Sequence, residues 1–472
     1  MNDELKNETR TDGNEVTAVN SSFIIHHSSL SVLVLGMNLT GTACVRFLQG
    51  KVARLVWGDT RPQAKVGPAA AEETLIAERL FELTDFASAG DIDLVVTSPG
   101  LPLDLPLFEQ ARQRGAETIG EIELASRVLD TPLLVVTGTN GKGTTVTLTG
   151  AMLQQAGLRC RVVGNIGDPL INHVDAARDL DFLVVEASSF QLESTVTFRP
   201  FVGALLNAAP DHLEHHRTFD NYLAAKARLF AHQRPEDHAV LGVDDPAVKG
   251  LVGRVGAQVH TFATGTAATG AWLDGEMLCL EGVGPLLPVR EIGLRGPHNV
   301  RNAMAAALIA RLAGAPPEAI VRALRAARPL EHVQELVAEI GGVRYINDTK
   351  ATNPAAALAA LDAVEGPVIV IAGGSEKNAD FTGLGQQLAE RVKLLLVIGD
   401  CGPRLAEVTR AAGGESIEAY ESLQAAVSRA AEVAEPGDTV LLAPACASFG
   451  LFENYAHRGR VFRELVRGLE KR

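Results

Sequence analysis

The stretch from Leu133 to Thr145 limits the possible folds most strongly, because an apolar, β-branched run stops at a glycine-rich turn. The run ends in Thr-Gly-Thr-Asn-Gly-Lys at 137–142, and helix-compatible sequence follows from 146 to 156. A strand, a glycine-rich loop and a helix in this order are typical of a phosphate-binding loop, where backbone N–H groups and the helix N-terminus face an anion. We predict that Lys142 reaches the outer phosphates as a mobile charge.

This stretch departs at two positions from the strict pattern G-x-x-x-x-G-K-[ST]. Val136 stands where the first glycine should be, and Gly143 stands where a hydroxyl that binds magnesium should be. Thr144, one position later, is the nearest substitute for that hydroxyl. Taken alone, the stretch also allows a second interpretation, a glycine-rich turn with a solvated lysine.

Length and composition set wider limits. A chain of 472 residues is too long for one hydrophobic core, so about three domains are expected. The net charge of −14 argues against general binding to nucleic acids or membrane surfaces. The five cysteines form no C-x-x-C pair, which predicts reduced, mostly buried thiols in a cytoplasmic protein. No apolar run approaches the ~20 residues that span a bilayer.

The first region follows an N-terminal tail over residues 1–30, of which residues 1–22 are polar. The tail is predicted to be disordered, and an upstream start codon chosen in error is the alternative. A strand over 31–35 leads into a turn and a helix, but Asn38 replaces the middle glycine of a dinucleotide fingerprint, so a nicotinamide cofactor is weakly supported. Asp59 after the second strand is placed for a ribose hydroxyl, and Arg61 for a phosphate. A nucleotide-like ligand is favoured over simple turn chemistry.

In the central region, Glu186 ends a buried strand and is well placed to hold Mg²⁺, although a helix-capping role is the commoner one for a single acid. Three histidines over 211–216 suggest zinc, but their spacing matches no common zinc motif, so a loop with one working histidine fits better. Pattern alone makes Lys226 a solvated helix lysine. Residues 251–293 are rich in Gly and Thr and predict a small β subdomain.

The third region repeats a strand–loop–helix order with polar residues at the ends of the strands. Asn353 is a predicted N-cap with Pro354 at the first helical position. Such repeats indicate a doubly wound sheet with a site along the carboxyl edge of its strands.

Seven motifs, in order along nearly the whole chain, together resemble the Mur ligase family of ATP-dependent, amide-forming enzymes of peptidoglycan precursor synthesis. Three of them resemble the D-glutamate-adding members in particular: Glu-Ala-Ser-Ser-Phe-Gln-Leu-Glu at 186–193, Asn-Asp-Thr-Lys-Ala-Thr-Asn at 347–353 and Pro-Ala-Cys-Ala-Ser at 444–448. The other four are the phosphate loop at 137–142, Asn-Ala-Ala-Pro-Asp-His-Leu at 207–213, Ala-Lys at 225–226 and His-Asn-x-x-Asn at 298–302.

The resemblance implies an α/β fold of three domains after the tail. A Rossmann-like domain over 31–122 would bind the UDP end of the substrate. A P-loop ATPase-like domain over 123–328, with its small β subdomain, would bind ATP. A Rossmann-like domain over 329–472 would bind the amino acid. The implied substrates are UDP-N-acetylmuramoyl-L-alanine, D-glutamate and ATP, with Mg²⁺ as cofactor and an acyl phosphate as intermediate. We expect a cytoplasmic monomer without nucleic-acid or membrane partners.

The resemblance also implies roles for single residues. The UDP-sugar contacts would be Leu39, Thr40, Thr60, Arg61 and, near the muramoyl group, Asn165. The ATP contacts would be Thr139, Asn140, Gly141, Lys142, Gly143, Thr144 and Thr145, with Asn299 and Asp348 at adenine and ribose. The metal would be held by Thr144, Glu186, His212 and a carbamylated Lys226, and the D-glutamate pocket would contain Lys377, Ser448 and Tyr455.

The chain departs from the family pattern at Val333, where an arginine is usual after His332, and at Gly450, where an acid is common. Gly143 is similar to the sister family of folylpolyglutamate synthases, which remains a rival interpretation, although that family lacks the Rossmann-like first domain. A non-catalytic nucleotide-binding regulator is the second rival. It would need none of Glu186, His212 and Lys226 together.

Overall fold

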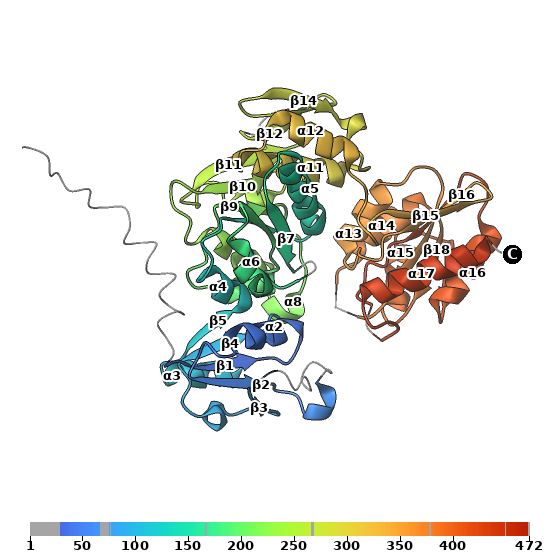
Figure 1. Cartoon of the computed structure of the whole chain (residues 1–472). Helices are drawn as coiled ribbons and strands as arrows, with labels where there is room; N and C mark the ends of the chain where they lie inside the picture. Colours follow the sequence, from blue (N-terminus) through green and yellow to red (C-terminus); the bar gives the residue numbers. More distant parts are fainter. Residues whose placement is uncertain are drawn as a thin grey trace, which may run out of the picture. The chain divides into compact units, whose positions relative to one another are not determined.

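The computed structural model describes residues 29–66, 75, 77–165, 168–265, 269–376, 379–448 and 450–470, and it contains three sheets with helices (Figure 1). The predicted α/β fold is confirmed. Among these residues, no helix combines the length and the apolar character needed to cross a membrane. The chain divides into two compact units, Met1–Val135 with Arg159–Phe201 and Arg228–Asp237, and Val136–Leu158 with Val202–Ala227 and His238–Arg472.

The first sheet has five parallel strands in the order β3-β2-β1-β4-β5, as in a Rossmann-like domain. Its strands are β1 (Ser31–Leu35), β2 (Arg54–Gly58), β3 (Glu78–Leu80), β4 (Leu94–Thr97) and β5 (Glu117–Gly120). Helices α2 (Leu39–Leu48), α3 (Pro106–Gln113) and α4 (Glu121–Ser126) accompany them. The central strand β1 is almost wholly buried, because parallel strands covered on both faces need apolar residues in succession.

The second sheet has nine strands in the order β14-β13-β12-β11-β10-β9-β6-β8-β7. These are β6 (Leu133–Thr137), β7 (Cys160–Gly164), β8 (Phe182–Glu186), β9 (Val202–Leu205), β10 (His238–Gly242), β11 (Gln258–Ala263), β12 (Ala271–Asp274), β13 (Met277–Leu280) and β14 (Gly284–Pro288). The predicted small β subdomain is not separate. Strand β12 pairs in parallel with β11, and the antiparallel strands β13 and β14 continue the same sheet.

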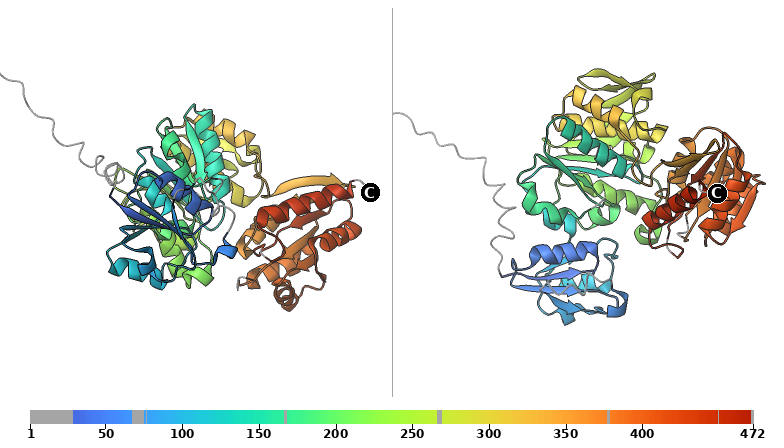
Figure 2. Two further views of the ribbon diagram at one scale, coloured as in Figure 1. Left: turned by 60° about the horizontal axis from the view of Figure 1, so that its bottom comes forward. Right: turned by 45° about the vertical axis from the view of Figure 1, so that its right-hand side comes forward.

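Helices of this region carry several of the predicted site residues. They are α5 (Lys142–Gln155), α6 (Val174–Ala177), α7 (Ser189–Glu193), α8 (Leu213–His216), α9 (Phe219–Ala227), α10 (Pro246–Lys249), α11 (Pro297–Leu312) and α12 (Pro317–Ala326). Helix α5 packs against α11 and α12, and its small residues allow close approach (Figure 2). The beginning of α5 at Lys142 is therefore held by tertiary packing as well as by the loop before it.

The third sheet has six strands in the order β15-β16-β20-β17-β18-β19, with helices on both faces. Along β17, Val368, Val370 and Ala372 face one core, and Ile369 and Ile371 face the other. The strands are β15 (Glu335–Ile340), β16 (Val343–Asn347), β17 (Val368–Gly373), β18 (Val392–Ile398), β19 (Ile417–Tyr420) and β20 (Thr439–Leu442). The helices are α13 (Pro354–Asp362), α14 (Thr382–Arg391), α15 (Gly402–Ala411), α16 (Leu423–Val433) and α17 (Tyr455–Leu469). This is the predicted doubly wound arrangement.

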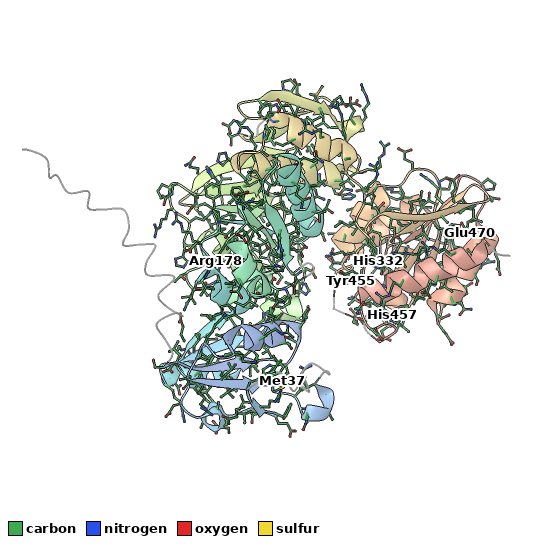
Figure 3. All side chains as sticks on the ribbon, in the orientation of Figure 1. Met37, Arg178, His332, Tyr455, His457 and Glu470 are labelled. Atoms are coloured by element: carbon green, nitrogen blue, oxygen red, sulfur yellow. A yellow bond between two sulfur atoms is a disulfide. The ribbon has the colours of Figure 1, made fainter. Side chains whose placement is uncertain are left out.

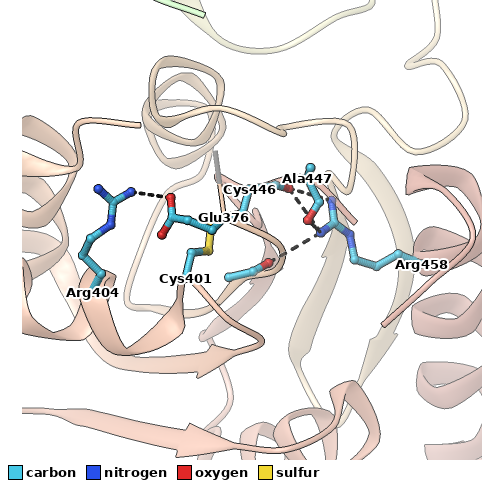
Figure 4. Close-up of a disulfide and its surroundings, with 7 residues drawn as sticks. Glu376, Cys401, Arg404, Cys446, Ala447 and Arg458 are labelled. Carbon is cyan, nitrogen blue, oxygen red and sulfur yellow. Dashed lines mark hydrogen bonds and ion pairs between the residues drawn. A yellow bond between two sulfur atoms is a disulfide. The ribbon is translucent and has the colours of Figure 1, made fainter. Parts of the chain in front are cut away.

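One sequence-based expectation about this sheet is wrong. Cys401 and Cys446 were expected as reduced thiols, but they form a disulfide (Figure 4). The two residues follow β18 and β20, which flank β17, so the topology brings both to the same carboxyl edge of the sheet. Their separation of 45 residues gives no local sequence signal for the pairing. Cys44, Cys160 and Cys279 remain buried thiols, as expected.

Candidate active site

The predicted phosphate loop lies between the end of β6 at Thr137 and the start of α5 at Lys142. Gly141 caps the helix with a positive φ of 86°. A Cβ atom at Gly141 would come within 2.2 Å of the Asn302 side-chain oxygen, so a larger residue there would require the Asn302 side chain to move. The loop therefore has a tight geometry that depends on glycine at this position.

Side chains from two neighbouring segments brace this loop. The Asn207 side-chain oxygen accepts hydrogen bonds from the backbone N–H groups of Thr139 (3.1 Å) and Asn140 (2.9 Å), and its amide nitrogen donates to the Asn140 carbonyl (3.0 Å). The Thr139 hydroxyl lies 3.0 Å from the Tyr222 hydroxyl and accepts from the Ala209 N–H at 2.9 Å. Burial raises the pKa of Tyr222, which keeps its hydroxyl protonated. Sequence reasoning assigned no role to Asn207 or Tyr222.

Two lysines converge on one carbonyl in this loop. The Lys142 ammonium donates to the carbonyls of Gly138 and Thr139, both at 3.0 Å, and the Lys226 ammonium donates to the same Gly138 carbonyl at 2.8 Å. Lys226 is only 1% exposed, and its nitrogen lies 4.4 Å from the centre of the Tyr222 ring. The pattern-based expectation of a solvated Lys226 is therefore wrong, because α9 turns this position inward.

Glu186 is the last residue of β8, and its two carboxylate oxygens differ in their hydrogen bonding. Its Oε1 accepts a hydrogen bond from the Asn165 amide at 2.7 Å, so Asn165, expected near the muramoyl group, contacts this carboxylate. Its buried Oε2 has no hydrogen-bond partner among the residues that the structure describes. A buried carboxylate oxygen left in this way fits a hard cation such as Mg²⁺.

The remaining metal candidates lie at the phosphate loop and beyond β9. Thr144 is half-buried in the first turn of α5, and the buried hydroxyl of the adjacent Thr145 lacks a hydrogen-bond partner within the described part of the chain. His212 has a left-handed backbone, with φ 55°, and caps α8. Its imidazole nitrogens lie 3.8 Å from an Asp211 oxygen and 3.5 Å from a Glu214 oxygen. A threonine hydroxyl and an imidazole can each take part in binding a metal or a phosphate.

Asn299 is linked to the phosphate loop through α11. Its amide donates to the Arg295 carbonyl at 2.7 Å, and its oxygen accepts from the Asn302 amide at 3.1 Å. Asn302 is the residue whose side chain lies beside Gly141. The predicted nucleotide contact and the loop glycine therefore share one neighbour, which sequence reasoning named only as part of a motif.

In the first sheet, the predicted UDP-sugar residues follow β1 and β2. Leu39 at the start of α2 is 65% exposed, and Thr40 follows it. Arg61, after Thr60, donates its Nε and Nη2 to the two carboxylate oxygens of Asp59, both at 2.8 Å. Figure 3 labels Met37, whose N–H also donates to Asp59 at 2.8 Å.

Asp59 therefore positions Arg61, whereas sequence reasoning placed it at a ribose hydroxyl. Burial acts to raise the pKa of Asp59, but the hydrogen bonds from Arg61 and Met37 outweigh it and hold that pKa below its usual value. The bond to Asp59 in turn raises the pKa of Arg61. The guanidinium is thus fixed and charged, as a phosphate contact requires.

The predicted residues of the third sheet follow its strands. Asp348 comes directly after β16 and is buried, and its carboxylate accepts from the Gln334 amide at 2.6 Å. Ser448 is buried after β20. Tyr455, which Figure 3 labels, begins α17, and its ring lies 5.5 Å from the Lys350 ammonium. Lys377 lies outside the described residues.

Comparisons with known proteins agree with the motifs. Family models match residues 30–120 (Mur ligase MurD-like, N-terminal domain), 136–310 (Mur ligase middle domain) and 333–446 (Mur ligase, glutamate ligase domain). The chain is 42% identical to the UDP-N-acetylmuramoylalanine–D-glutamate ligase of Pelotomaculum thermopropionicum, over 93% of this chain and 98% of that protein. It is 43% identical to the ligase of the same name from Acidobacterium capsulatum, over 92% and 95%.

Solved structures share the fold at lower identity. The UDP-N-acetylmuramate-alanine ligase of Thermotoga maritima superposes with a TM-score of 0.59 at 17% identity, covering 93% of this chain and all of that one. A MurF ligase from the same organism, solved in complex with ADP, gives a TM-score of 0.57 at 16% identity, over 80% of this chain and 95% of that one. At this identity the likeness establishes the three-domain fold.

Proposed function

The chain belongs to the Mur ligase family, and on that premise we propose that it joins D-glutamate to UDP-N-acetylmuramoyl-L-alanine while ATP is converted to ADP and phosphate. Relatives that carry this activity in their names match it at 42% and 43% identity over nearly their whole lengths. The structural observation that carries the proposal is the convergence of Lys142 and Lys226 on the Gly138 carbonyl of a braced phosphate loop.

The proposed first step is the attack of the substrate carboxylate on the γ-phosphorus of ATP. Both reactants are anions, so their repulsion has to be offset by fixed positive charge. Lys142 and the first N–H groups of α5, within the loop over 139–145, would bind the phosphates. Asn207 already accepts from the N–H groups of Thr139 and Asn140, so these bonds fix the shape of the loop. The step forms an acyl phosphate and releases ADP.

The second step is the displacement of phosphate by the amine of D-glutamate. We propose Lys377, Ser448 and Tyr455 for the D-glutamate pocket, Asn299 and Asp348 for adenine and ribose, and Leu39, Thr40, Thr60, Arg61 and Asn165 for the UDP-sugar. Water must be kept away from the acyl phosphate, which would otherwise hydrolyse. Domains over 31–122, 123–328 and 329–472 that close around the substrates would exclude it. ATP dependence favours the cytoplasm as the place of action.

We propose that Glu186, His212, Thr144 and a carbamylated Lys226 hold the magnesium, which when bound would neutralise developing phosphate charge. Two ammonium groups on one carbonyl repel each other, which favours a change at one of them. The neutral Lys226 amine would attack the carbon of CO₂, form an N–C bond and lose a proton to solvent. The resulting carbamate carries a negative oxygen, the ligand type that hard cations take.

The proposed activity is tested by phosphate release with ATP, UDP-N-acetylmuramoyl-L-alanine and a panel of amino acids. We expect release that depends on both cosubstrates and is fastest with D-glutamate. Lys142→Ala should lower turnover about 10²-fold or more while leaving the fold intact, because it removes a phosphate clamp from a loop. Equal rates with L-glutamate or glycine would reject the assigned acceptor, and normal turnover of Lys142→Ala would reject the phosphate loop.

A further inference from the structure

Gln334 contacts the carboxylate that the proposed function places at the nucleotide ribose. Its side-chain amide donates to Asp348 Oδ2 at 2.6 Å, and its backbone N–H donates to the same carboxylate. The amide also lies 3.4 Å from the Ala360 carbonyl of α13. Gln334 therefore holds the Asp348 carboxylate in place at the carboxyl end of β16.

The backbone at Gln334 has a strained conformation, in which the Gln334 side chain contacts Asp348. His332 and Gln334 have φ values of 67° and 49°, in the left-handed region that disfavours residues other than glycine. Several contacts hold the strained segment: the His332 N–H donates to Glu335 Oε2 (2.9 Å), the His332 carbonyl accepts from the Lys350 N–H (3.3 Å), and the Asn347 amide lies 3.0 Å from His332 Nδ1. Strain that the surroundings maintain in this way commonly marks a functional residue.

The electrostatics of Asp348 depend on the same contacts. Burial raises the pKa of Asp348 to about 7, against the opposing effect of the two Gln334 hydrogen bonds and of the Lys350 charge. Lys350 is the charged group that acts on this carboxylate. From β20, the Leu442 carbonyl accepts from the Asp348 backbone N–H at 2.9 Å. Without the Gln334 donors, Asp348 would take up a proton at a higher pH.

We propose that Gln334 is a positioning residue for nucleotide binding, which orients the Asp348 carboxylate and keeps it ionised for the ribose hydroxyls of ATP. This inference rests on the proposed function, because Asp348 is placed at the ribose there. Gln334 directly follows Val333, the residue that replaces the arginine usual in the family, so this role would give the segment a part in nucleotide binding. An amide suits the task, since it donates strongly without adding a charge beside the ligand.

The test is the pH dependence of KM for ATP in wild type, Gln334→Met and Gln334→Lys, measured from pH 6 to 9. Methionine keeps the length of the side chain but removes its donor, and lysine supplies a charged one. In wild type, KM should rise as pH falls through about 7. Gln334→Met should shift this midpoint to higher pH and raise KM about tenfold at pH 6.5. Gln334→Lys should shift it to lower pH.

A merely structural role of Gln334 would not shift the pH midpoint of KM in opposite directions in Gln334→Met and Gln334→Lys. Gln386→Met, at an exposed position of α14, is the matched control and should keep the wild-type profile. The titration of ATP itself is common to all variants. Urea unfolding of each variant checks that the third domain remains folded, and a variant that is unfolded is replaced by Gln334→Asn, whose shorter amide should shift the midpoint in the direction of methionine.

Asp348→Asn separates failure of this inference from failure of the proposed function. If Asp348→Asn raises KM for ATP but the Gln334 variants keep the wild-type midpoint, the role of Gln334 is rejected and the ribose assignment stands. If Asp348→Asn leaves KM for ATP unchanged, the ribose assignment itself is rejected. A change in KM for D-glutamate rather than ATP in Gln334→Met would also overturn the inference.

Discussion

Two buried cations, Lys226 and Arg458, contact backbone carbonyls at the carboxyl ends of strands in different sheets, but their chemistry differs. Both are 1% exposed. Lys226 donates to Gly138 directly after β6. Arg458 donates to the carbonyls of Thr349, Gly373, Cys446 and Ala447, and to the Thr349 hydroxyl, at the ends of β16, β17 and β20. Figure 4 shows its bonds to Cys446 and Ala447.

The comparison separates a reactive cation from a structural one. An amine can lose its proton and react, whereas a guanidinium stays charged and offers five donors in a fixed plane. Burial lowers the pKa of Arg458 to about 9, so it remains protonated at neutral pH. We infer that Arg458 cross-links three strand ends, and that Lys226 changes its charge when the protein is active.

The largest expected effect comes from Lys226→Ala, which should lower turnover about 10²- to 10³-fold, because it removes a proposed ligand oxygen from the phosphate site. Added acetate or formate should restore part of the activity by occupying the vacated position. Lys226→Arg should stay inactive, since it keeps the charge and does not form a carbamate. Lys249→Ala, on the exposed end of α10, is the matched control. An active Lys226→Arg would make this lysine a structural cation like Arg458.

Reduction of the Cys401–Cys446 disulfide should have the next largest effect, on stability. Opening a cross-link between residues 45 apart should lower the free energy of unfolding by about 2–4 kcal/mol. Urea unfolding with and without a reductant measures this difference. Cys401→Ser should be insensitive to the reductant. Titration of five thiols in the untreated protein, rather than three, would show that the bridge does not form in solution.

Arg458→Met should destabilise the protein by about 1–3 kcal/mol, because it leaves buried carbonyls without donors. It should also raise KM for D-glutamate, since the carbonyls of Cys446 and Ala447 lie beside Ser448. Arg467→Met, on the exposed face of α17, should change neither quantity. If Arg458→Met were as stable as wild type, Arg458 would not be a structural cation.

The smallest effect is expected for Arg61, a half-exposed cation that is paired with a carboxylate. Arg61→Ala should raise KM for the UDP-sugar about tenfold, the loss expected for one charge-assisted contact, and leave KM for ATP unchanged. Arg112→Ala, on the surface of α3, serves as the control. Equal changes in both KM values would reject the assignment of the first sheet to the UDP-sugar.

Sequence reasoning predicted the features that depend on local order and missed those that depend on packing. The loop after β6 was predicted because it follows a strand directly, and Glu186 was singled out because it ends a buried strand. The burial of Lys226 was missed by pattern, because it depends on how α9 packs and not on its amphipathicity. Asn207 accepts a hydrogen bond from Asn140, 67 residues away in the sequence. Gln334, which has a left-handed backbone, donates to Asp348, 14 residues away. Neither contact leaves a local signal in the sequence.

The most direct test of the central claim is the fate of oxygen in the substrate carboxylate. With UDP-N-acetylmuramoyl-L-alanine labelled with ¹⁸O in its carboxylate, attack on the γ-phosphorus should carry one labelled oxygen into each phosphate released during D-glutamate-dependent turnover. Mass spectrometry of the phosphate measures this transfer. One ¹⁸O per phosphate is the predicted result. Unlabelled phosphate, formed at the same rate as the amide product, would contradict an acyl-phosphate ligase.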